Sequence, residues 1–160
     1  MIKTFNDGIL RDYGTFVVAT PRNLPHLNDS PFGLPLNWHI DPLSMASEEF
    51  LNLLQRLDAL TFGPEGMPMD KWVFYDCAEL PGFIYGFAMP ASELTAHERE
   101  LFGASPGYDG PVPISMYIAI PMYEEGTWFG HNLASLNRTF PDRGLHHLGS
   151  ITKAIAMKAF

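Results

Sequence analysis

The sequence predicts an α/β (α+β) domain in which helices flank a mixed, mainly antiparallel sheet. Three segments carry this prediction: an alternating apolar strand at 114–122, an amphipathic helix at 44–62, and a strand, turn and helix between 127 and 160. The chain has 160 residues, and 46% of them are hydrophobic. It is therefore long enough for one domain with its own core and too short for two ordinary ones.

Residues 1–43 are predicted to form an extended N-terminal arm, and residues 44–160 the α/β domain. Residues 15–20 (TFVVAT) have the composition of a strand, but five prolines interrupt the chain from residue 21 to residue 42. The same stretch carries seven large apolar side chains, too many for a solvated linker. We therefore expect the arm to pack on its own domain or on a neighbouring subunit.

The helix at 44–62 is predicted from large apolar residues that recur every three or four positions on one helical face. Ser44 or Ser47 can cap its start, and Gly63-Pro64 can end it. Its opposite face is polar, as expected for a helix that flanks a sheet.

Two strands, at 71–79 (KWVFYDCAE) and 83–89 (FIYGFAM), are predicted to form a β-hairpin around the turn Leu80-Pro81-Gly82. The segment from Thr95 to Glu98 then has the form of a capping box, which predicts a short helix that ends at Gly103. A surface loop rich in Gly and Pro is expected after it.

The clearest strand is 114–122, in which every second residue is Ile or Met. Residues 123–126 (YEEG) can turn the chain back into a second strand within 127–136. A turn at 141–144 (PDRG) and a helix rich in Ala, Ile, Lys and Met, starting at Gly149-Ser150, complete the predicted order.

This last helix has the features of an anion-binding site. A helix N-terminus presents unpaired N–H groups and about half a positive charge, so a phosphate can bind there. Glycine permits close approach of a ligand, and Ser150 can cap the helix or donate to a phosphate oxygen. The residues fit equally well with an alternative in which Gly144 and Gly149 are turn and cap glycines without a ligand.

Charge favours a small polyanion over a polymer. The net charge of −8 argues against nucleic acid, whereas residues 126–160 hold four basic side chains and one acidic side chain. No apolar stretch is long enough to span a membrane, and the N-terminus lacks the apolar core of a signal peptide. We therefore expect a soluble, cytoplasmic protein without membrane association.

The turn and helix resemble the acyl-CoA pyrophosphate loop of the GNAT acyltransferase superfamily. The residues that carry the resemblance are Pro141, Arg143, Gly144, Gly149 and Ser150. His146 and His147 stand where the family usually has a middle glycine, and the spacing from Arg143 to Gly149 is one residue longer. Antiparallel strands before a glycine turn and a helix are also the order of the family's N-terminal half. The family continues with a further strand beyond the point that corresponds to Phe160, so we expect either that the sequence is a fragment or that the protein uses half of the fold, completed by another subunit.

The resemblance implies an acyl-CoA-dependent N-acyltransferase that modifies a small amine or a protein amine. Acyl transfer needs a base for the proton of the amine and N–H donors for the carbonyl oxygen. The candidate bases are His131 and Glu125. The residues expected to bind the cofactor, acetyl-CoA or another acyl-CoA, are Arg143, Gly144, His146, Gly149 and Ser150.

No metal site is predicted, because no pair of histidines has the helical spacing of a zinc site. The competing interpretation of the chain is a non-enzymatic assembly subunit, such as a component of a phage virion or another large particle. The apolar, proline-broken arm, an aromatic content of 13% and the divergent loop favour it. Such a subunit would form a homo-oligomer or a larger assembly through the arm. A third interpretation is a binding module that uses the same basic pocket without chemistry.

Overall fold

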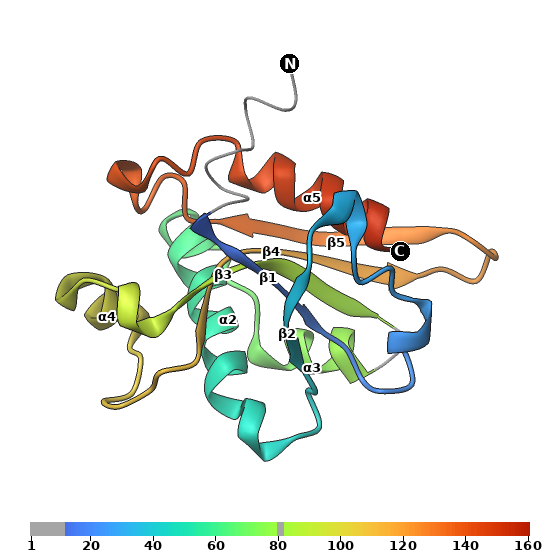
Figure 1. The fold of residues 1–160 in the computed structure, drawn as a ribbon, viewed down its shortest axis with the longest axis horizontal. Coiled ribbons are helices and arrows are strands. Elements are labelled where there is room, and N and C mark those ends of the chain that lie inside the picture. Colours follow the sequence, from blue (N-terminus) through green and yellow to red (C-terminus); the bar gives the residue numbers. More distant parts are fainter. Residues whose placement is uncertain (1–11, 80–81) are drawn as a thin grey trace.

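The computed structural model describes residues 12–79 and 82–160, without the side chains of His26, Tyr75 and residues 77–79. In that part of the chain, five strands form one sheet in the order β2-β1-β3-β4-β5 (Figure 1). Only β1 and β2 run parallel to each other, so the predicted α/β class with a mixed, mainly antiparallel sheet is confirmed. The strands are β1 (Gly14–Val18), β2 (Leu36–Ile40), β3 (Phe83–Pro90), β4 (Pro111–Pro121) and β5 (Trp128–Ser135).

Helices cover both faces of this sheet (Figure 1). On one face, the ring of Phe16 in β1 meets that of Phe50 edge-on, with 5.0 Å between the ring centroids. On the other face, the hydroxyls of Ser115 in β4 and Thr152 lie 2.6 Å apart. The helices are α2 (Glu48–Phe62) and α3 (Lys71–Glu79) on the first face, α5 (Leu148–Ala159) on the second, and the short α4 (Ala96–Phe102) beyond one end of the sheet.

The N-terminal segment contributes two strands to the sheet. β1 lies between β2 and β3, and Phe16, Val17 and Val18 are completely buried. Part of the predicted arm therefore belongs to the same sheet as the strands of residues 44–160. The prolines are accommodated because Pro25 and Pro31 stand in the first turns of short 3-10 helices, where a missing N–H costs little.

The predicted hairpin of 71–79 with 83–89 is wrong. Residues 71–79 form α3, and β3 pairs with β1 and β4 instead. Asp70 starts the helix: its Oδ1 accepts a hydrogen bond from the N–H of Trp72 at 3.0 Å. Phe74 is buried while Trp72 is 61% exposed. Residues two positions apart would lie on the same face of a strand, so this difference in burial is typical of a helix. Leu80 and Pro81, in the predicted turn, lie outside the described residues.

The other predicted elements are confirmed. A 3-10 turn (Met45–Ser47) leads into α2, and Ser44 Oγ accepts a hydrogen bond from the N–H of Ala46. The capping box is complete: Thr95 and Glu98 exchange hydrogen bonds of 2.8 and 3.2 Å, and α4 ends at Gly103 in the left-handed region. β4, β5 and α5 begin within three residues of their predicted positions.

Candidate functional site

The predicted phosphate loop lies between β5 and α5. A 3-10 turn (Pro141–Arg143) is followed by Gly144, whose φ of +65° is in the left-handed region that favours glycine. Leu145 and Leu148 are buried, whereas His146 and His147 between them are exposed. The two leucines thus hold the loop on the core and leave its polar residues facing solvent.

The N-terminus of α5 presents free hydrogen-bond donors. The N–H groups of Leu148 and Ile151 donate to Leu145 O and His147 O, but those of Gly149 and Ser150 have no acceptor among the described residues. No acidic residue lies in the first turn, and the side chain of His147 does not cap the helix. These two N–H groups can therefore bind an anion.

Arg143 is engaged by α4 rather than directed at the free N–H groups. Its guanidinium holds the Glu98 carboxylate in a bidentate pair, through Nε to Oε1 and through Nη2 to Oε2 at 2.5 Å. Nη2 also donates to Glu93 O at 2.8 Å. The pair lowers the pKa of Glu98 to about 2 and raises that of Arg143. In this arrangement Arg143 fixes the loop to α4, and its charge is neutralised by Glu98.

The two glycines of the loop have structural reasons of their own. At position 144 the left-handed backbone conformation favours glycine, although a Cβ there would meet open space. Gly149 sits close to β5, and a Cβ on it would lie 3.2 Å from Ser135 Oγ. Gly149 therefore lets α5 approach the sheet, a role that does not depend on a ligand.

The predicted bases lie along β5. His131 is exposed, and it is the extra residue of a β-bulge, because Ile118 pairs with Asn132 and Ala119 pairs with Gly130. Glu125 is exposed in the turn before β5. At about 3.3 Å per residue, β5 is about 23 Å long, so Glu125, in the turn before its first residue, lies beyond the far end of the strand from the loop, whereas His131 is about 13 Å from the end that leads to the loop. One chain thus gathers the predicted cofactor residues in one loop and leaves Glu125 far from them.

Tyr117 is a possible site residue that was not predicted from the sequence. Its hydroxyl lies against Gly130, since a Cβ on Gly130 would come within 2.1 Å of that oxygen. A proton donor therefore stands beside the bulge at His131. The alternation of 114–122 gave no signal for it, because Tyr117 belongs to the less apolar face of that strand.

Asp58 is a second residue that was missed. It is completely buried in α2, where its Oδ1 accepts a hydrogen bond from Asn132 Nδ2 at 2.9 Å and its Oδ2 one from the N–H of Met69 at 2.6 Å. Burial raises the pKa of Asp58. The two hydrogen bonds lower it, but their effect is smaller. The signal for Asp58 in the sequence was an acidic residue next to Leu57, on the apolar side of the predicted helix. The hydrogen bond from Asn132 holds β5 against α2 next to the bulge.

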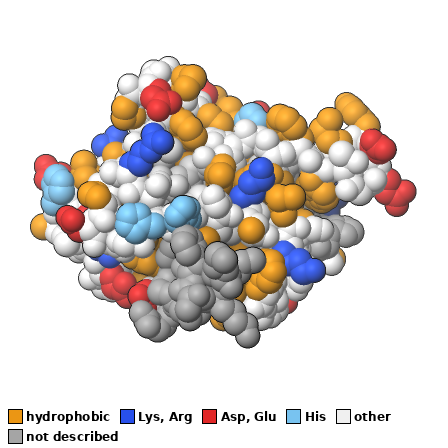
Figure 2. Space-filling model, turned by 90° about the horizontal axis from the view of Figure 1, so that it is seen from above, with side chains coloured by type: hydrophobic (Ala, Val, Ile, Leu, Met, Phe, Trp, Pro, Cys, Tyr) orange, Lys and Arg blue, Asp and Glu red, His pale blue; other side chains and the backbone are white. Residues whose placement is uncertain are grey.

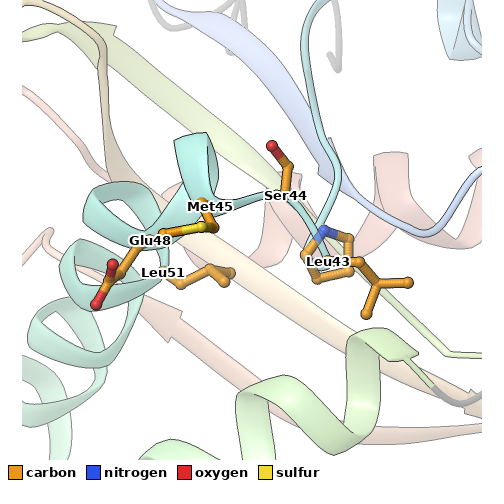
Figure 3. Close-up of a pocket in the computed structure, with 6 residues that line it drawn as sticks. Leu43, Ser44, Met45, Glu48 and Leu51 are labelled. Carbon is orange, nitrogen blue, oxygen red and sulfur yellow. The ribbon is translucent and has the colours of Figure 1, made fainter.

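The described residues include no group of three His, Cys, Asp or Glu side chains that could hold a metal ion. A shallow hollow of about 200 Å³ lies at the start of α2 (Figure 3). Its lining is mostly apolar, and polar groups do not converge on it, so we assign it no chemistry. The lining residues are Pro42, Leu43, Ser44, Met45, Glu48 and Leu51.

No protein-family model, curated protein or solved structure matches this chain. Within residues 12–79 and 82–160, no helix has both the length and the apolar character needed to cross a membrane. The functional assignment therefore depends on the geometry of the loop and of β5.

Proposed function

We propose that this chain binds the pyrophosphate of an acyl-CoA at the N-terminus of α5 and transfers the acyl group to a small amine or a protein amine. The observation that carries the proposal is the pair of N–H groups of Gly149 and Ser150 at the start of α5, which have no acceptor among the described residues and no acidic neighbour in the first turn. Such a site favours phosphate oxygens. A cytoplasmic location belongs to the proposal.

Charge on the surrounding surface supports an anionic ligand. Figure 2 shows the face on which α5 lies: Lys and Arg side chains are spread over its middle, and Asp and Glu side chains lie toward its margins. Arg138 and Lys153 are exposed, whereas Arg143 is paired with Glu98. In the proposal, Arg143 positions the loop, and the backbone together with His146 and Ser150 contacts the phosphates.

The bulge in β5 supports acyl transfer beside the bound phosphates. His131 would accept the proton that the amine loses as its nitrogen bonds to the acyl carbon. Backbone N–H groups freed at the bulge would donate to the carbonyl oxygen. As the C–S bond breaks, the thiolate would take a proton from Tyr117, whose hydroxyl lies against Gly130.

The test uses a carboxylate placed at the α5 N-terminus. Ser150→Asp should keep the fold, because an acid in the first turn of a helix is favourable, but it should repel phosphate. Ala154→Asp, at an exposed position farther along α5, is the matched control. Coenzyme A should raise the melting temperature of the wild type and of Ala154→Asp but not of Ser150→Asp. Wild-type protein that gives no heat and no thermal shift at about millimolar coenzyme A would rule out this function.

A non-enzymatic assembly subunit is the second candidate, and exposed apolar side chains favour it. Tyr123 is fully exposed and Phe129 is 52% exposed, in a hairpin that projects from the sheet. The pairing of Arg143 with Glu98 also fits a scaffold that no longer needs a phosphate ligand. This candidate predicts no response to coenzyme A, together with a sedimentation coefficient that rises with protein concentration.

A further inference from the structure

β5 is an edge of the described sheet that lacks proline and charged residues, although a β-bulge interrupts it. The opposite edge, β2, has five residues and is flanked by Pro35 and Pro42. β5 has eight residues, and none of them is Pro, Lys, Arg, Asp or Glu. Proteins block edge strands with short length, proline and charge, because an unblocked edge pairs with other strands. The difference between the two edges marks β5 as a pairing surface.

An apolar patch continues this edge onto the β4–β5 hairpin. We call Met122, Tyr123, Trp128 and Phe129 the hairpin patch; their exposed fractions are 49%, 106%, 39% and 52%. Figure 2 shows hydrophobic side chains gathered at the right-hand end of the molecule, next to acidic ones. Trp128 is held in place by the rings of Phe83 and Phe160, at 5.1 and 5.9 Å. Fixed, exposed aromatic groups are typical of protein interfaces.

The two ends of β5 carry opposite charges. Glu124 and Glu125 are exposed in the turn that precedes the strand, and Arg138 is exposed just after its other end. Among the described residues, none forms an ion pair with Arg138. Two antiparallel copies of this strand would place the acidic end of each beside the basic end of the other. The edge is thus complementary to itself in direction and in charge.

We propose that two copies of this chain pair through β5, antiparallel about a two-fold axis, into a continuous sheet of ten strands, five from each copy. Side chains project above and below a sheet, so the pairing leaves the faces free. The bulge at His131 divides the edge into two short straight runs. We therefore expect a reversible dimer with a Kd on the order of 10–100 µM, as for small interfaces.

Charge reversal tests this arrangement. Arg138→Glu places like charges together at both ends of the dimer and should weaken it about tenfold. Glu124→Lys with Glu125→Lys should do the same, and the three changes combined should return Kd to within about threefold of the wild type. Lys158→Glu, which makes the same change in charge at an exposed site on α5, should leave Kd unchanged.

Sedimentation equilibrium from about 5 to about 500 µM gives these Kd values. Hydrogen exchange of the same full-length chain locates the interface: amides of residues 128–135 should gain protection as concentration rises, and those of residues 36–40 should not. A wild type that stays monomeric throughout this range overturns the proposal. So does a dimer without added protection in β5, or a triple variant that is no tighter than Arg138→Glu.

Discussion

Glu98→Gln tests whether the ion pair with Arg143 holds the candidate loop in place. The carboxylate makes two contacts: a bidentate pair with Arg143, and a hydrogen bond from the N–H of Thr95 that forms part of the capping box of α4. A glutamine keeps the shape, but in either orientation its NH₂ group faces an N–H of the guanidinium, because both oxygens of Glu98 accept from Arg143. One donor then loses its acceptor in a site where the Glu98 side chain is only 10% exposed.

The size of the loss follows from the pKa of Glu98. The difference between the ordinary pKa of 4.5 and about 2 corresponds to about 3–4 kcal/mol, at about 1.4 kcal/mol per pH unit. Water reaches a fifth of the Arg143 side chain, which screens the pair, so we expect a loss of about 2 kcal/mol at pH 7. For a chain of this length, that is a fall of about 4–8 °C in Tm.

The pH dependence separates an ion pair from a packing defect. A carboxyl whose folded pKa is lowered stabilises the protein above its unfolded pKa, and that stability is lost as the pH falls toward the folded pKa. The difference in unfolding free energy between wild type and Glu98→Gln should therefore shrink to less than half between pH 7 and about pH 3. Urea titrations followed by tryptophan fluorescence measure it, with the exposed Glu100→Gln as the control. A loss equal to that of Glu100→Gln, or one independent of pH, would refute the reasoning.

Three further predictions concern the sheet and the helix α2 that packs on it. Phe16→Ala should destabilise the protein by about 3–5 kcal/mol in urea unfolding, because the ring is completely buried against Phe50. A chain lacking residues 1–43 loses this ring and the rest of β1, so it should show no cooperative unfolding. A truncated chain that still folds would contradict this prediction. Asp58→Asn should show the opposite pH trend to Glu98→Gln. Burial raises the pKa of Asp58, so wild type should gain stability relative to the variant as the pH falls from 7 to about 4, and no change in their difference would count against it.

The elements that the sequence predicts correctly are those whose signals are local. The capping box at Thr95 and Glu98 lies within four residues, and the alternation in β4 depends only on nearest neighbours. Residues 71–79 show the limit of local signals. Aromatic and β-branched residues favoured a strand, but Asp70 caps a helix there, and the place beside β3 belongs to β1, which lies almost seventy residues earlier in the chain.

The candidate site was predictable as a loop but not as a set of contacts. The order of strand, turn and helix could be recognised from glycines and charges. The partner of Arg143 is 45 residues away in the sequence, and no spacing rule connects the two. The tight packing of Gly149 on β5 likewise depends on how the helix crosses the sheet. These tertiary contacts decide which loop residues remain free for a ligand.

The two proposals meet at β5 and together make one more prediction. Within one chain, Glu125 lies beyond the far end of β5 from the loop, but antiparallel pairing would bring Glu125 of the partner subunit beside the end that leads to the loop. If that carboxylate, rather than His131, serves as the base, each site draws its phosphate loop from one copy and its carboxylate from the other. Glu125→Gln and Ser150→Asp should each be inactive alone, but an equal mixture should regain about a quarter of wild-type activity, since half of the dimers are mixed and each holds one intact site. Two inactive variants that stay inactive when mixed under conditions where sedimentation shows dimers would exclude such a shared site, while leaving phosphate binding and the dimer itself to their own tests.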